Sequence, residues 1–200
     1  MLRPLPSPPD AGDELALVDR VRRGDRGAFE TIYKRFHRPL GAYLLRLTGR
    51  PEAVDELVDD TLLVVWRGAA RFDGRSRLST WIFGIAYRKA LKHFERQRRE
   101  ASHLGVAEGE PVAADDAPDR RHARRELAQQ VVAALDRLPA EQRSVVMLTY
   151  YQGLSYPEIA AVMDCPLGTV KTRMFHARRK LARLLAAAGV ALGGEDRDEP

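Results

Sequence analysis

The chain has 200 residues and a formal net charge of +5, and 44% of its residues are hydrophobic and 30% charged. This balance excludes a wholly disordered or fibrous chain and predicts one or two small globular domains. The basic charge favours a polyanionic partner. The single cysteine, Cys165, excludes an internal disulfide and a zinc site built from cysteines. We expect this residue to fill a turn and not to act as a redox switch.

The N-terminal residues 1–24 begin with the proline-rich stretch MLRPLPSPPDAGDE. This stretch lacks the apolar segment of a secretory signal peptide, so we expect a disordered leader followed by the start of the first helix. No apolar run in the sequence approaches the roughly 20 residues that span a bilayer, and we expect no membrane insertion. A lone unpaired thiol also fits a reducing compartment, which favours a cytoplasmic protein.

The next part of the chain is predicted to form three helices. Apolar and aromatic side chains recur every three or four residues over residues 29–47, which predicts the first helix. Gly49 ends it and Pro51 begins the second, because proline suits the first helical turn. A polar connection at residues 68–79 leads to a third helix at residues 80–99. Since no alternating strand pattern and no internal repeat is present, the predicted fold class is all-α.

The second helix gathers acidic residues on one face, namely Asp55, Glu56, Asp59 and Asp60. Side chains four apart on a helix are neighbours, and like charges at that spacing destabilise an isolated helix by roughly 0.2–0.5 kcal/mol per pair. A basic chain that concentrates acid here is therefore expected to meet a basic protein surface, with Leu63 exposed beside the carboxylates. The alternative is a solvated acidic face without a partner.

Aromatic and basic residues alternate over residues 72–99. Basic side chains hold phosphates, and aromatic rings stack on unpaired bases with about 1–3 kcal/mol per base. The segment is therefore expected to hold a short melted stretch of nucleic acid. The alternative is a core role, which we favour for Ile82, Ile85 and Phe94 and leave open for Trp81. For Phe72, which lies in the polar connection, we favour the nucleic-acid role.

The composition shifts after the third helix. Residues 106–119 contain five acidic residues, no basic residue and no large apolar side chain except valine, so they cannot bury enough surface to become ordered. We therefore predict two small helical domains, residues 25–100 and 125–186, joined by a flexible acidic linker at residues 101–124. The C-terminal tail, residues 187–200, is predicted to be disordered.

Residues 153–185 are predicted to form a helix-turn-helix. Ser155 and Glu158 have the spacing of a capping box at the start of the first helix, and Pro166 helps to begin the second. Over residues 170–184, an apolar stripe recurs every three or four residues while the charged residues beside it are all basic. Such a helix, braced by another at a turn, fits the major groove of DNA. A solvated face is the alternative, but it normally mixes charges of both signs.

No spacing in the sequence resembles a metal site, a nucleophile elbow or a phosphate-binding loop, and the five histidines are scattered. We therefore expect no catalytic residue, no bound metal and no cofactor. A DNA-binding protein of the response-regulator type is a rival interpretation, but no alternating strand–helix pattern precedes the helix-turn-helix. A nonspecific packaging protein is a further rival, although its charge would be less local.

Three segments, in this order, resemble the extracytoplasmic-function (ECF) sigma factors of the sigma-70 family. VDELVDDTLLVVW resembles the helix that binds core RNA polymerase, and FDGRSRLSTWIFGIAYRKAL resembles the segment that reads and melts the −10 promoter element. GLSYPEIAAVMDCPLGTVKTRMFHARRKL resembles the helix-turn-helix that reads the −35 element. The chain departs from the family pattern at Asp59, where glutamine is usual, and at Arg88, where asparagine is usual.

The resemblance implies a sigma factor that directs core RNA polymerase to specific promoters and helps to melt the DNA, with promoter DNA and an anti-sigma factor as further partners. The implied polymerase-binding residues are Asp55, Glu56, Asp59, Asp60 and Leu63. Those implied for the −10 element are Phe72, Arg75, Ser76, Arg77, Ser79, Trp81, Arg88, Lys89 and Lys92. Those implied for the −35 element are Thr169, Lys171, Thr172, Arg173, His176, Arg178 and Arg179.

Overall fold

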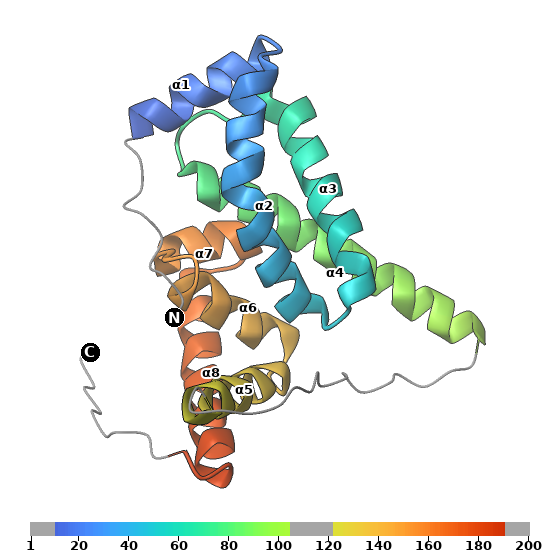
Figure 1. The fold of residues 1–200 in the computed structure, drawn as a ribbon, viewed down its shortest axis with the longest axis vertical. Helices are drawn as coiled ribbons and strands as arrows, with labels where there is room; N and C mark the ends of the chain where they lie inside the picture. Colours follow the sequence, from blue (N-terminus) through green and yellow to red (C-terminus); the bar gives the residue numbers. More distant parts are fainter. Residues whose placement is uncertain (1–10, 105–121, 191–200) are drawn as a thin grey trace.

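The computed structural model describes residues 11–104 and 122–190, and all regular elements in those two ranges are helices (Figure 1). The first range contains α1 (Ala11–Arg22), α2 (Arg26–Thr48), α3 (Pro51–Gly68), the 3-10 turn η1 (Ala69–Arg71) and α4 (Leu78–Leu104). The second contains α5 (His122–Asp136), α6 (Ala140–Tyr150), α7 (Tyr156–Met163) and α8 (Leu167–Ala187). The all-α prediction is confirmed for these residues. Most of the predicted leader, linker and tail lies outside them.

A separate helix, α1, occupies residues that the sequence assigned to a leader and the start of a first helix. Val18 and Val21 of α1 are buried against the rest of the first domain. Gly24, whose φ of 83° lies in the left-handed region, then turns the chain toward α2. Asp25 caps α2, since its side chain accepts a hydrogen bond from the Ala28 N–H at 3.1 Å. Because α1 is short and buries few side chains, its sequence pattern is weaker than those of the longer helices.

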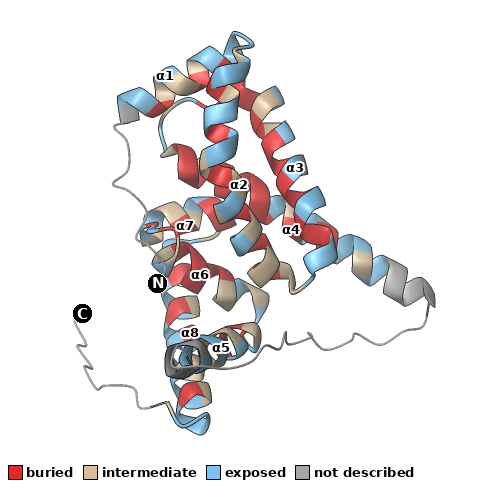
Figure 2. Ribbon diagram, in the orientation of Figure 1, coloured by how far each residue is buried: buried red, intermediate tan, exposed pale blue. Residues whose placement is uncertain are grey.

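The helices α2 and α3 form a hairpin, and the predicted boundary at Gly49 and Pro51 is confirmed. Gly49 adopts a left-handed conformation with φ 67°, and its N–H donates to the Leu45 carbonyl oxygen at 2.8 Å. Pro51 then occupies the first turn of α3. The two apolar stripes pack together and are buried (Figure 2), and they include Ile32, Phe36, Leu40, Leu44, Val54, Leu57, Val58, Leu62 and Val65.

In the second domain, α7 and α8 form the predicted helix-turn-helix. The capping box at the start of α7 is confirmed, because the Ser155 N–H donates to the Glu158 side chain at 2.8 Å. Asp164 ends α7 in a left-handed conformation with φ 49°. Val170 and Met174 of the predicted apolar stripe on α8 are buried, which turns the basic residues of α8 outward.

The two domains pack directly on each other, with α7 against α4 and α6 against α2 (Figure 1). Their buried apolar residues form one continuous core. At its centre, the ring of Tyr43 meets Phe83 edge-on at 5.3 Å between centroids, and its hydroxyl lies 3.3 Å from the Ser144 hydroxyl of the second domain. Burial raises the pKa of Tyr43, so the residue stays neutral. The linked but separate domains expected from the sequence thus share an interface in this structure.

Candidate nucleic-acid interface and protein-docking surface

The acidic residues predicted on α3 lie on the side of that helix opposite its buried stripe. The exposed ones are Asp55, Glu56 and Asp59. Asp60 is half-buried, and its carboxylate accepts a hydrogen bond from Lys89 of α4 at 2.7 Å. We call these four acidic residues the acidic face. Glu56 lies 3.9 Å from Arg96 of α4, so Asp55 and Asp59 are the carboxylates most available to a basic partner.

An apolar pocket of about 630 Å³ adjoins the acidic face. Phe29 of α2 packs edge-on against Trp66 of α3, with 5.0 Å between ring centroids, and Leu63 is 42% exposed. The residues that line the pocket are Arg26, Phe29, Tyr33, Asp59, Asp60, Leu62, Leu63 and Trp66. We call this pocket the docking groove. Sequence reasoning found Leu63 but missed the aromatic residues; the spacing of Phe29 and Tyr33, four apart at the edge of a stripe, was the available signal.

The polar connection between η1 and α4 exposes only part of what the sequence predicted. Arg75 and Ser76 are exposed. Phe72, in contrast, is only 2% exposed, and Ser79 is also buried. The ring of Phe72 lies 5.3 Å from that of Trp81, centroid to centroid. The direct nucleic-acid role favoured for Phe72 is thus corrected to a packing role, because burying an aromatic ring against a second ring and the core is more favourable than leaving it in water.

The predicted basic residues along α4 are placed differently from one another. Arg88 and Lys92 are exposed, whereas Lys89 is half-buried and paired with Asp60 as described above. Trp81 is half-buried and packs against the core with one side. Together with Arg75, the exposed residues give the first domain a basic surface beside the connection.

The helix α8 presents its predicted DNA-binding residues on the side opposite Val170 and Met174. The exposed ones are Lys171, Thr172, His176, Arg178 and Arg179, and Thr169 is half-buried. The Tyr150 hydroxyl accepts a hydrogen bond from Arg178 at 2.9 Å, which raises the pKa of that guanidinium. No acidic residue occurs over residues 168–183, so this side of the helix is positively charged throughout.

Arg173, also predicted to read DNA, is held by the protein itself. Its guanidinium lies 2.7 Å from a carboxylate oxygen of Glu141 on α6, and it donates to the sulfur of Cys165 at 3.5 Å. Cys165 is half-buried in the turn before α8 and packs against the core, as its predicted turn-filling role requires. Arg173 must therefore leave or share Glu141 to bind a base or a phosphate.

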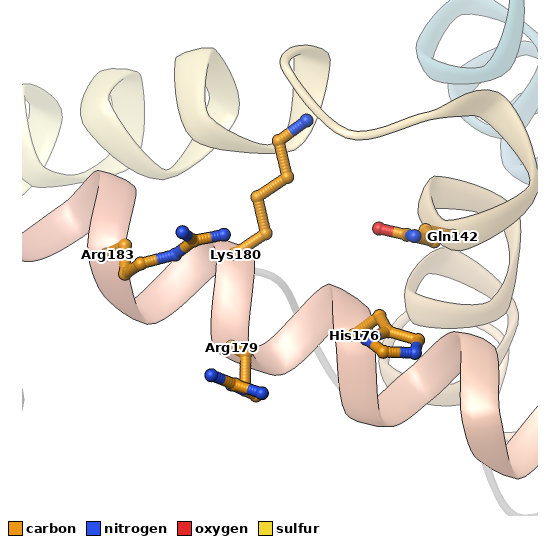
Figure 3. Close-up of a pocket in the computed structure, with 5 residues that line it drawn as sticks. All are labelled: Gln142, His176, Arg179, Lys180 and Arg183. Carbon is orange, nitrogen blue, oxygen red and sulfur yellow. The ribbon is translucent and has the colours of Figure 1, made fainter.

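Basic side chains of α8 also line a pocket of about 330 Å³, with Gln142 of α6 on its other side (Figure 3). The α8 residues that line it are His176, Arg179, Lys180 and Arg183. Lys180 and Arg183 were not among the predicted site residues, although they belong to the same basic run. Positive charges gathered in a concave surface attract anions, so the basic surface of α8 extends past its predicted end.

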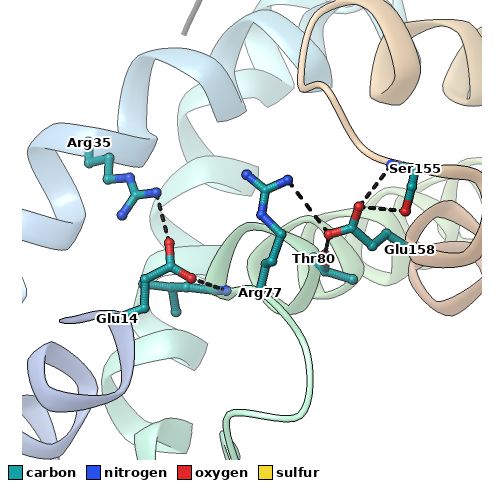
Figure 4. A network of polar contacts seen from close by, with 7 residues as sticks. Glu14, Arg35, Arg77, Thr80, Ser155 and Glu158 are labelled. Carbon is teal, nitrogen blue, oxygen red and sulfur yellow. Dashed lines mark hydrogen bonds and ion pairs between the residues drawn. The ribbon is translucent and has the colours of Figure 1, made fainter. Parts of the chain in front are cut away.

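The capping residue Glu158 also connects the two domains (Figure 4). One oxygen accepts the Ser155 N–H and hydroxyl, while the other accepts the Thr80 hydroxyl of α4 at 3.1 Å. Arg77, in the −10 segment, lies 3.7 Å from the same carboxylate. Burial disfavours the charged carboxylate, but these hydrogen bonds and the charge of Arg77 outweigh it, and the pKa of Glu158 lies below its ordinary value of 4.5.

Replacing Glu158 by glutamine is expected to lower the free energy of unfolding at neutral pH by on the order of 1 kcal/mol, because hydrogen bonds to a charged group are lost. A carboxyl group whose pKa is lowered by folding stabilises the fold above pH 4.5, and this contribution disappears as the pH falls through the folded-state pKa. Urea unfolding from pH 7 to pH 3 should therefore show the two proteins converging in acid. A difference that stays constant over this range would contradict the role of the charge.

Within residues 11–104 and 122–190, no helix is long and apolar enough to cross a membrane. No group of three or more His, Cys, Asp or Glu side chains in them is arranged to hold a metal ion.

Comparisons with known proteins agree with the arrangement of these surfaces. The family model for sigma-70 region 2 matches residues 32–100, and that for sigma-70 region 4 matches residues 128–181. The ECF RNA polymerase sigma-E factor of Escherichia coli K12 is 32% identical over 173 residues, covering 82% of this chain and 90% of that protein. The RNA polymerase sigma-H factor of Pseudomonas aeruginosa is 29% identical over 177 residues, covering 84% and 92%.

Solved structures show the same likeness. The sigma factor RpoE of Bartonella quintana, in complex with the anti-sigma factor NepR, superposes with a TM-score of 0.66 at 28% identity, covering 79% of this chain and 96% of that chain. CnrH, in complex with the cytosolic domain of CnrY, superposes with a TM-score of 0.63 at 29% identity, covering 89% and 99%.

The fold and its charged surfaces therefore define a DNA-binding transcription initiation factor. The chain belongs to the ECF sigma factors of the sigma-70 family, as the resemblance of its three segments predicted. It directs core RNA polymerase to promoters and so initiates promoter-specific transcription.

Proposed function

We propose that the chain divides its sigma-factor function among three surfaces. The acidic face and the docking groove bind core RNA polymerase, the connection with α4 reads and melts the −10 element, and α8 reads the −35 element. The observation that carries this proposal is the separation of charge: an exposed acidic helix beside an apolar groove lies in one domain, and a wholly basic reader helix lies in the other.

The docking groove is suited to a basic helical surface with some apolar side chains. It is lined by the rings of Phe29, Tyr33 and Trp66 together with the carboxylates of Asp59 and Asp60. Burial of apolar surface supplies binding free energy, and charges beside it speed and orient the encounter. The combination of apolar and charged side chains is typical of protein–protein interfaces.

On the −10 side, we assign direct contacts to the exposed Arg75, Ser76, Arg88 and Lys92. Arginine and lysine hold phosphates, while the half-buried Trp81 offers one side of its ring to an unpaired base. Phe72 then has a supporting role, because its buried ring packs against Trp81. In this proposal Arg77 and Lys89 exchange their internal carboxylates for phosphates.

On the −35 side, α8 enters the major groove with the residues of its first half. Lys171, Thr172, Arg173 and His176 face base edges, because the N-terminal part of a recognition helix reaches the bases in this motif. Thr169 lies at the start of the helix, and Arg178 and Arg179 hold phosphates farther along. A bidentate arginine–guanine pair contributes about 1–3 kcal/mol of discrimination between bases.

The chain is proposed to catalyse no reaction itself, because its surfaces bind and position while the polymerase carries out the chemistry. Its proposed location is the cytoplasm, where polymerase and chromosome are. An anti-sigma factor is a proposed partner, since RpoE of Bartonella quintana was solved in complex with one.

The decisive experiment is reconstitution of the chain with core RNA polymerase, followed by run-off transcription on genomic fragments. The expected result is a set of promoter-specific transcripts whose start sites define shared −10 and −35 elements. Core polymerase alone is the control. Selection of duplex sites by the chain without any binding to polymerase would contradict the proposal.

A further inference from the structure

The helix α1 is hydrogen-bonded to η1 and to Phe72, the first residue of the connection between η1 and α4. The guanidinium of Arg22 donates to the carbonyl oxygen of Ala69 at 3.0 Å and also to that of Phe72. Both acceptor residues are buried. These two hydrogen bonds tie the start of the short turn and the residue after it to α1, and so they set the direction in which the chain continues.

The middle of the connection packs against α1 at Gly74. This glycine has φ 74°, a conformation that other residues rarely adopt. A Cβ atom at this position would lie only 3.3 Å from Cδ1 of Leu15 on α1, so the lack of a side chain permits the close approach. Arg75 and Ser76, which are exposed candidate −10 residues, follow directly in the chain.

The end of the connection is fixed by Glu14 of α1, which is only 3% exposed. One of its carboxylate oxygens accepts the Leu78 N–H at 2.8 Å, and the other accepts a hydrogen bond from Arg35 at 2.9 Å (Figure 4). The first N–H groups of a helix lack partners within it, and a negative charge is favourable there. Glu14 therefore caps α4 from another helix, which explains why α4 begins at Leu78 and not at residue 80.

A buried carboxylate is costly unless it is paired and hydrogen-bonded. Glu14 meets that requirement through Arg35 on one side and the Leu78 N–H on the other. Arg35 of α2 thus fixes the position of the Glu14 carboxylate, and the carboxylate in turn fixes the Leu78 N–H at the start of α4. The connection is consequently held by α1 at its beginning, its middle and its end.

We propose that α1 is a clamp that holds this connection in the conformation needed to read the −10 element, with Glu14 as its main positioning residue. The inference rests on the proposed function, in which the connection carries Arg75 and Ser76 to the DNA. Glu14 itself does not touch DNA and acts through Leu78. The clamp lies outside residues 32–100, the part of the first domain that the family model matches.

The test uses the full chain with core RNA polymerase on a promoter obtained from the run-off experiment. The readout is the ratio of open complex on that promoter to open complex on the same promoter with one −10 base changed, measured by permanganate reactivity of unpaired thymines. Glu14→Ala is expected to lower this ratio by about fivefold, the effect of losing a helix cap of typical strength. Affinity for core polymerase and preference for the −35 element should not change.

Two further variants of the clamp make the result specific. Glu14→Gln retains an oxygen that can accept the Leu78 N–H, so it should lower the ratio less than Glu14→Ala does. Gly74→Ala strains the middle of the connection, where it packs against Leu15 of α1, and should lower the ratio as Glu14→Ala does. If Glu14→Ala does not fold, as judged by circular dichroism, these two variants decide the question.

Two control variants separate the clamp from loss of charge and from loss of stability. Asp13→Ala removes the same charge from an exposed position of α1 and should keep the wild-type ratio. Ile159→Val lowers stability through the buried core of α7 and should also keep it. If Glu14→Ala and Gly74→Ala both keep the wild-type ratio, the clamp is overturned. It is also overturned if Ile159→Val lowers the ratio as much as they do. Either result leaves the proposed function standing. The proposed function itself fails if the wild-type chain gives no reactive thymines with core polymerase.

Discussion

Replacing Asp59 by lysine is expected to weaken binding to core RNA polymerase by about tenfold or more, which corresponds to about 1.4 kcal/mol. Asp59 is exposed on the acidic face and lines the docking groove, so the reversal sets a positive charge against the basic partner surface. Close charge pairs at interfaces contribute about 1.5–7 kcal/mol of coupling. The affinity should be measured without DNA, by titrating a fluorescently labelled chain with core enzyme. In run-off transcription, the variant should lose activity equally on all promoters.

The matched control for this prediction is Glu126→Lys, which makes the same charge change at an exposed position of α5, far in sequence from the acidic face. Its affinity for core enzyme should stay close to that of the wild type. If both variants lose affinity equally, the effect is one of net charge. If Asp59→Lys binds as the wild type does, polymerase docks on another surface.

Replacing Arg173 by alanine is expected to reduce the preference of the holoenzyme for its −35 sequence over an altered one by about tenfold or more, since a bidentate arginine–base contact contributes about 1–3 kcal/mol. The same residue is paired with Glu141 in the free chain. Glu141→Gln should therefore keep the preference and bind the promoter somewhat more tightly, because Arg173 no longer has to leave a carboxylate. Competition between labelled promoter duplexes measures both effects.

Arg183→Ala is the control for Arg173, because it removes an exposed arginine from the later part of the same helix. It should weaken binding to all −35 sequences alike, as expected for a phosphate contact. A uniform loss in Arg173→Ala as well would assign that residue to the phosphate backbone. An unchanged preference with unchanged affinity would remove it from the interface.

The parts of the fold that depend on local pattern were predictable from the sequence. The capping box of Ser155 and Glu158 and the Gly49–Pro51 boundary each depend on residues within a few positions of one another, and helical stripes depend on spacings of three and four. The resemblance of three segments to one family likewise uses local patterns. It placed the acidic helix and the reader helix correctly in the all-α fold.

Features that depend on distant residues were not predictable in this way. Phe72 lies among polar neighbours, which suggested a nucleic-acid role, but its ring is buried in the core against Trp81, and Arg22 of α1 bonds to its carbonyl oxygen. Glu158 was predicted only as a local cap, yet it also bonds to Thr80, which is 78 positions away in the chain. The packing of the two domains on each other was also not predictable, because it joins residues that lie far apart in the sequence on either side of the linker.

Four of the cations assigned to DNA are already paired with carboxylates within the chain. These pairs are Arg75 with Asp73, Arg77 with Glu158, Lys89 with Asp60, and Arg173 with Glu141. Ordinary basic residues displace mobile counterions from DNA, and that release drives nonspecific binding, with a salt slope of about 0.9 per phosphate neutralised. When a basic residue leaves its carboxylate partner to bind a phosphate, the freed carboxylate must take up a counterion of its own. The chain should therefore hold arbitrary DNA more weakly, and with less dependence on ionic strength, than its number of basic residues suggests, which leaves more of it free to meet polymerase.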